Sequence, residues 1–322
     1  MSAWRRNIIA CILIVILIFI LNPLAQAFVL QGQHILELMT ERLGQAHSLF
    51  ISQKVVFYNI GEKPVAVEEP EAGTPSMDDS QPSISEQDDI SPQPVEIELA
   101  PDKIEMEETL RYLFSDGFRS EIMTDDNHRI HVFAAGQAFT VIDGAAQLNP
   151  ETRFDLYKDI LLFRSRPELA SRLSLLNVDV SLSSLTRFEG QIAFSIGAED
   201  ADEPVAQLLV DKESFFPLRW IIANGNTAYG AAPLEVRYLD WWQLDDSFWY
   251  PMRIEFFQND SLVRSIQVQR YEVNPSFSPE LFNINALRSK YPTAAPAFSG
   301  SSKSEDVSEV QKTIEEFRKI FE

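Results

Sequence analysis

The chain has 322 residues, of which 45% are hydrophobic, and this is enough for one large core. Its formal net charge of −21 argues against a nucleic acid or an anionic membrane surface as partner, since both attract basic patches. The one cysteine, Cys11, argues against a disulfide framework, a cysteine metal site and a thiol nucleophile.

The first 27 residues have the pattern of an export signal. Arg5 and Arg6 precede an apolar run from Ile8 to Leu21, and Ala25-Gln26-Ala27 offers the small-x-small site that a signal peptidase cuts. The run is shorter than the roughly 20 residues of a spanning helix. We therefore expect cleavage after Ala27 and a periplasmic protein; an uncleaved anchor is the alternative. Cys11 would leave with the signal.

A helix, a strand and an acidic insertion come next. Apolar residues at helical spacing predict a helix from Gln33 to Ala46, and alternating apolar residues predict a strand from Leu49 to Tyr58. Residues 62–103 are rich in Pro, Glu, Asp and Ser and have no periodicity. This composition indicates a disordered, solvated loop, whose deletion should cost little stability; a docking tail is the second interpretation.

The rest of the chain reads as strands interrupted by one helical stretch. Helical periodicity covers Phe154 to Phe163 and Pro167 to Leu176. The expected strands lie around Ile104 to Phe114, Arg129 to Phe133, Phe139 to Ile142, Leu182 to Phe188, Ile192 to Ile196, Ala206 to Val210, Leu218 to Ala223, Leu234 to Trp242, Trp249 to Phe257 and Val263 to Tyr271. Short turns between them predict an α+β fold with one antiparallel meander of about ten strands and helices on one side.

The sheet domain is expected to span residues 28–290. Residues 291–303 have the composition of a linker, and Val307, Val310, Ile314 and Phe317 predict an amphipathic helix over residues 304–322. Such an apolar stripe usually faces a core, and binding of a partner protein is the second interpretation.

No catalytic or metal-binding constellation is present in the sequence. His128 and His131 are three residues apart in an expected strand, so their side chains point to opposite faces. With His34 and His47, they are interpreted as surface residues. The motifs G-x-S-x-G and H-E-x-x-H and a Gly-rich phosphate loop are missing. We expect a protein that is not an enzyme and holds no metal or cofactor.

The late strands are rich in aromatic residues. Pairs such as Trp241-Trp242 and Phe256-Phe257 place one ring on each face of the sheet. Both a sheet that wraps around a cavity and an ordinary thick core account for this pattern.

The order of several segments resembles the exported LolA-like family, the periplasmic carriers of outer-membrane lipoproteins. The N-terminal helix precedes a strand with Ser52-Gln53-Lys54-Val55, and Glu108 to Phe114 and Gly136 to Ile142 follow. Asp246 to Arg253 and the closing segment from Asn274-Pro275 to Asn283 complete the similarity, which spans about residues 33–285.

The resemblance implies a strongly curved, unclosed barrel whose helices form a lid over an apolar cavity for acyl chains. The residues expected to line this cavity are Phe57, Tyr112, Phe139, Leu156, Ile160, Trp220, Tyr238 and Phe256. One departure puts the cargo in doubt: the family's lid-holding arginine, near the end of the second strand, is replaced here by Ser115.

Two functions remain open at this point. The first is a periplasmic carrier that binds lipoprotein acyl chains or another lipid for transport towards the outer membrane. The alternative is a non-enzymatic envelope sensor or an accessory subunit of a transport complex, which binds protein through the acidic loop and the C-terminal helix. For either function we expect a monomer with a partner protein in the inner or outer membrane, and no nucleic acid.

Overall fold

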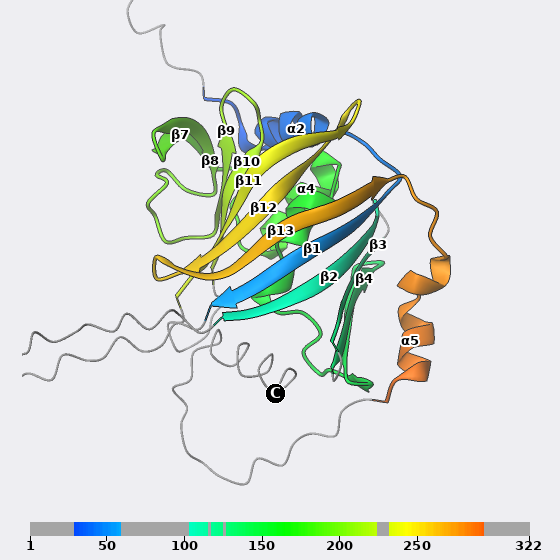
Figure 1. Cartoon of the computed structure of the whole chain (residues 1–322). Coiled ribbons are helices and arrows are strands. Elements are labelled where there is room, and N and C mark those ends of the chain that lie inside the picture. The colour runs from blue at the N-terminus through cyan, green and yellow to red at the C-terminus, as the bar shows by residue number, and fades with distance from the viewer. Residues whose placement is uncertain (1–28, 59–102, 115–116, 125–126, 224–231, 293–322) are drawn as a thin grey trace, which may run out of the picture.

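A single antiparallel sheet of 13 strands dominates the computed structural model (Figure 1). The structure describes residues 29–58, 103–114, 117–124, 127–223 and 232–292. The strands are β1 (Ser48–Tyr58), β2 (Lys103–Leu113), β3 (Gly117–Met123), β4 (His128–Ala134), β5 (Gln137–Ile142), β6 (Ala145–Ala146), β7 (Ser183–Phe188), β8 (Gln191–Ile196), β9 (Gln207–Asp211), β10 (Pro217–Ile222), β11 (Leu234–Asp245), β12 (Phe248–Gln258) and β13 (Ser261–Val273).

The strand order shows why the sheet is a meander with one long crossing. It runs β6-β5-β4-β3-β2-β1-β13-β12-β11-β10-β9-β8-β7. Strands that are consecutive in sequence therefore pair with each other, with one exception: β6 and β7 do not pair, because they form the two opposite edges of the sheet. The first and last strands, β1 and β13, pair antiparallel in the middle of the sheet. The helical stretch between β6 and β7 must cross from one edge to the other.

The expected single antiparallel sheet is confirmed, with 13 strands rather than about ten. The sequence interpretation missed β3 and β6. In β3 the buried residue Ser120 interrupts the apolar alternation of Phe118 and Ile122, and β6 has only two residues. Lys103, assigned to the acidic insertion, is instead the first residue of β2 and pairs with Tyr58.

Helices occupy both faces of the sheet. The helical elements are α2 (Gly32–Leu43), the 3-10 turn η2 (Arg153–Asp155), α3 (Lys158–Leu162), α4 (Arg166–Leu175), the 3-10 turn η3 (Pro279–Phe282) and α5 (Ile284–Lys290). Figure 1 shows α4 within the curve of the sheet and α5 outside it, beside β3 and β4. The short helix α5 was not expected. Of the helices in the described ranges, none has the length and apolarity needed to cross a membrane.

Most of the apolar side chains form one large cluster between the sheet and the helices α2, α3 and α4. A smaller cluster on the convex face joins β4 and β5 to α5. The predicted signal peptide, the acidic insertion from residue 62 to 102 and the C-terminal helix over residues 304–322 lie outside the described residues.

Candidate functional site

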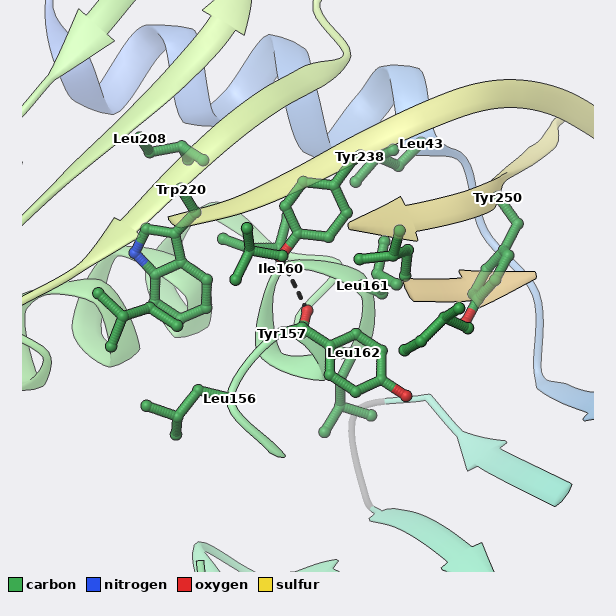
Figure 2. Packing of buried hydrophobic residues seen from close by; sticks show 14 of the residues in the cluster. Leu43, Leu156, Tyr157, Ile160, Leu161, Leu162, Leu208, Trp220, Tyr238 and Tyr250 are labelled. Atoms are coloured by element: carbon green, nitrogen blue, oxygen red, sulfur yellow. Dashed lines mark hydrogen bonds between the residues drawn. The ribbon is translucent and has the colours of Figure 1, made fainter. Parts of the chain in front are cut away.

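The segment that crosses the curve of the sheet, residues 151–175, is called here the lid segment. It contains η2, α3 and α4. Its apolar side chains Leu156, Tyr157, Ile160, Leu161 and Leu162 are each at most 7% exposed. Figure 2 shows them packed beneath side chains of the sheet, with the hydroxyl of Tyr238 donating a 3.0 Å hydrogen bond to the carbonyl oxygen of Tyr157.

The lid segment fills the interior in which a cavity was expected. Seven of the eight predicted lining residues lie in the one large cluster: Phe57, Tyr112, Leu156, Ile160, Trp220, Tyr238 and Phe256. Two of them, Leu156 and Ile160, belong to the lid segment itself. In this closed arrangement the interior is packed by side chains, and the predicted residues are brought together around it.

Phe139 is the exception and corrects the prediction. It pairs with Val132 across β4 and β5 and packs in the convex cluster with Ile284 and Leu287 of α5. The interior positions of these strands are occupied instead by His131 and Thr140, which pair opposite each other. The apolar character of Phe139 matches the convex face because α5, which was not expected, covers it.

A polar group that the sequence interpretation missed lies inside the same interior. Glu108 of β2 accepts a 2.7 Å hydrogen bond from Gln53 of β1 and a short one from Ser120 of β3. Arg264 of β13 lies 3.5 Å from the same carboxylate. All four side chains are nearly completely buried. Their signal in the sequence is parity: each stands at the inward position of an alternating strand, where an apolar residue is the rule.

Arg264 also links the sheet to the lid segment. Its Nη1 donates a 3.0 Å hydrogen bond to the carbonyl oxygen of Phe154. Phe57 and Phe256 are the residues opposite Arg264 on the two neighbouring strands. The guanidinium carbon of Arg264 lies 5.2 and 4.9 Å from the centroids of their rings. A cation between aromatic faces is stabilised by the ring quadrupoles, so Arg264 holds a fixed position within the aromatic interior.

Arg129 of β4 makes the second link to the lid segment. Its Nη2 donates to both carboxylate oxygens of Asp155, at 2.8 and 2.9 Å. Asp155 also accepts hydrogen bonds from the backbone and the hydroxyl of Thr152, both at 2.9 Å. Burial acts to raise the pKa of Asp155, but the charge of Arg129 and these hydrogen bonds outweigh it and hold the pKa well below its ordinary value.

A third charged group lies within the lid segment. Lys158, which is fully buried, lies 2.5 Å from Glu151 and 3.2 Å from Asp159. Arg172 of α4 closes the group through Asp159 at 2.6 Å and Glu151 at 2.9 Å. Burial acts to lower the pKa of Lys158, but the two carboxylates raise it above its ordinary value. These four charges balance one another and join Glu151, which precedes η2, to α3 and α4. Lys158 also donates a 3.1 Å hydrogen bond to the carbonyl oxygen of Asp155, which adds η2 to the same unit.

His131 corrects the interpretation of the histidines as surface residues. His34 and His47 are exposed, whereas His131 is fully buried beneath the lid segment. Its Nδ1 lies 2.8 Å from the hydroxyl of Thr140, and that hydroxyl donates to the carbonyl oxygen of Pro150. Burial lowers the pKa of His131 to about 4, so the ring is neutral at pH 7.

The chemistry of this site is that of a closed, mixed apolar and polar interior. Within the described ranges, no group of three His, Cys, Asp or Glu side chains is placed to hold a metal ion. The polar contacts between sheet and lid segment are hydrogen bonds and ion pairs, which can form and break reversibly.

Comparison with known proteins returns structures and no sequence match. No protein-family model and no curated protein match the chain. A domain from Vibrio parahaemolyticus assigned to outer membrane lipoprotein sorting is 10% identical, with a TM-score of 0.43 over 80% of this chain and 97% of that one. A LolA superfamily protein from Nitrosomonas europaea is also 10% identical, with a TM-score of 0.39 over 80% and 99% of the two chains.

A chain of the MucA/MucB complex of Pseudomonas aeruginosa is 11% identical, with a TM-score of 0.25 over 80% of this chain and 62% of that one.

Proposed function

We propose that the protein is a non-enzymatic periplasmic carrier that binds acyl chains, of a lipid or a lipidated protein, between the sheet and the lid segment. The observation that carries the proposal is how the lid segment covers the sheet: its side chains Ile160, Leu161 and Leu162 are buried against the concave face of a sheet that does not close. These three side chains are called the plug. An acyl chain offers the same kind of surface, so the two can exchange.

The lid segment is built to move as one body. The ion pairs among Glu151, Lys158, Asp159 and Arg172 are internal to it and survive its displacement. It is joined to the two edge strands, β6 and β7, which have a partner on one side only. Displacement therefore breaks no strand pairing in the sheet.

The free energy gained by burying an acyl chain is comparable to the free energy lost by displacing the lid segment. Each CH₂ group removed from water contributes about 0.8 kcal/mol, so a chain of about sixteen carbons offers on the order of 10 kcal/mol. The lid segment loses a similar apolar burial when it is displaced, together with the hydrogen bonds from Arg264 and Tyr238. A near balance of this kind permits loading and release without covalent chemistry.

A titration with a neutral, pyrene-labelled acylglycerol tests the proposal on the mature protein and on Ile160→Glu. A charge at the plug disfavours the closed state, so the variant should bind the probe about tenfold or more tightly than the parent. Ile192→Glu is the matched control, because Ile192 lies on β8 and is 41% exposed.

Native mass spectrometry of the parent, purified from the envelope, complements the titration and should find retained lipid mass. A parent that retains no lipid and binds no probe would overturn the proposal. Global unfolding of Ile160→Glu would do so as well, because it would mean that the lid segment is an inseparable part of the core.

A further inference from the structure

The interior beneath the lid segment has two chemically different halves. Under β9, β10 and β11 it is apolar, with Leu208, Trp220 and Tyr238 facing the lid segment (Figure 2). Under β4 and β5 it is more polar, because Arg129, His131 and Thr140 stand at inward positions beside Phe133. An interior of this kind matches an amphiphile rather than a plain hydrocarbon.

We infer that the cargo has an anionic head group, and that Asp155 occupies the place of that group beside Arg129 while the lid segment is closed. This inference rests on the proposed carrier function and names its substrate class. The lid segment itself has the chemistry of such an amphiphile, with Ile160 and Leu161 in the apolar half and the carboxylate of Asp155 in the polar half.

The two partners of this ion pair lie on different bodies. Arg129 belongs to the sheet, and Asp155 belongs to the lid segment, where Thr152 completes its hydrogen bonds. When the lid segment is displaced, the carboxylate leaves the guanidinium. The buried carboxylate of the sheet, Glu108, is matched by Arg264 and Gln53. A phosphate or carboxylate oxygen can then take the position that Asp155 leaves.

His131 supplies an independent observation at the same place. Its Nδ1–H donates to Thr140, since the Thr140 hydroxyl donates to Pro150, and the remaining ring nitrogen, Nε2, is thus an acceptor. This atom is completely buried and has no hydrogen-bond partner among the described residues. A buried acceptor without a partner is costly, and a head-group hydroxyl can satisfy it.

Competition against the neutral pyrene-labelled probe at pH 7.5 tests the inference with three ligands of one chain length. These are palmitate, palmitoyl-lysophosphatidic acid and monopalmitoylglycerol, which separate a carboxylate and a phosphate source from an uncharged head. We expect at least one anionic ligand to bind about tenfold more tightly than monopalmitoylglycerol. Arg129→Met should abolish that preference, so that the anionic ligands and monopalmitoylglycerol bind with equal affinity.

Arg119→Met is the matched control, because Arg119 is a buried arginine of the neighbouring strand that pairs with Glu121 and the carbonyl of Leu281 on the convex side. It should keep the preference for the anionic ligand. If Arg129→Met does not fold, Asp155→Asn decides, since removal of the competing charge should favour the anionic ligand more than the neutral one.

The outcomes separate this inference from the carrier function. Equal binding of all three ligands by the parent, or an equal gain for all three in Asp155→Asn, would overturn the anionic head group and leave the carrier intact. Binding of none of the three would overturn both.

Discussion

Arg164 donates a 3.0 Å hydrogen bond from Nη1 to the carbonyl oxygen of Leu43, and so joins the lid segment to the last residue of α2. Its Nε donates to the carbonyl of Leu161 at 2.7 Å, and its guanidinium lies between the rings of Phe114 and Phe248, at 5.0 and 4.7 Å. Burial lowers its pKa to about 10, so it stays charged at neutral pH.

Arg164→Met should therefore loosen the closed lid segment. The change leaves two carbonyl oxygens without their donor, at a cost of about 2 kcal/mol in the free energy of unfolding. It should lower the melting temperature and speed the association of an acyl probe in stopped-flow measurements. Arg166→Met is the control, since Arg166 is exposed and its ion pair with Glu37 spans 3.8 Å. A slower or unchanged association in Arg164→Met would contradict the prediction.

Gly44 fixes the end of α2 beneath the hairpin of β11 and β12. Its φ is +77°, and a Cβ at this position would lie 1.5 Å from the carbonyl oxygen of Ser247. Gly44→Ala should cost at least about 3 kcal/mol, because strain at positive φ and displacement of backbone add up. Gly136 has nearly the same φ, +73°, with no atom within 4 Å of its Cβ. Gly136→Ala should cost about 1 kcal/mol, and equal costs in urea unfolding would contradict the steric argument.

The alternation of apolar and polar residues correctly predicted which side chains of a single long strand point into the interior. Phe57 in β1 and Tyr112 in β2 stand at the inward positions of long, regular strands, so their burial follows from period two. Phe256 and Phe257 point to opposite faces as expected, with Phe256 fully buried and the Phe257 ring 4.3 Å from the guanidinium of Arg237.

What could not be predicted depends on contacts between distant segments. Phe139 is buried by α5, which starts about 145 residues later in the chain, and β5 alone does not reveal which of its faces is covered. Arg264 and Glu108 stand at inward positions of their strands, but their charge alone predicts exposure. Their burial requires the pairing of β1 with both β2 and β13, and sequence periodicity carries no information on that pairing.

The pairing of β1 with β2 makes a prediction about the acidic insertion. Tyr58 and Lys103 are opposite each other at the ends of these strands, so the residues between them can be replaced by a short hairpin turn. Shortening a loop about tenfold reduces the entropic cost of closing it, and this stabilises the fold by about 2 kcal/mol at most. A chain with residues 59–102 replaced by Asn-Gly and two flanking residues should melt at or above the parent temperature. A fall of more than a few degrees would mean that the insertion stabilises the fold.

His131 makes the stability of the protein depend on pH. Because its pKa falls from an ordinary value of 6.5 to about 4 on folding, the unfolded chain binds a proton between these pH values and the folded chain does not. Stability is therefore full above pH 6.5 and falls as the pH is lowered to about 4, by about 3 kcal/mol from this residue. Below that pH the contribution of His131 no longer changes.

Urea unfolding of His131→Asn between pH 7.5 and pH 4 measures this contribution. The amide of asparagine can replace the Nδ1–H donor to Thr140 without taking up a proton, so the variant should lose about 3 kcal/mol less than the parent over this range. The exposed residue His47 provides the control, and His47→Asn should follow the parent curve. Carboxylates that titrate in the same range act equally on all three proteins and cancel in the comparison. Parallel curves for the parent and His131→Asn would contradict the prediction, because they would mean that His131 takes up its proton equally in the folded and the unfolded protein.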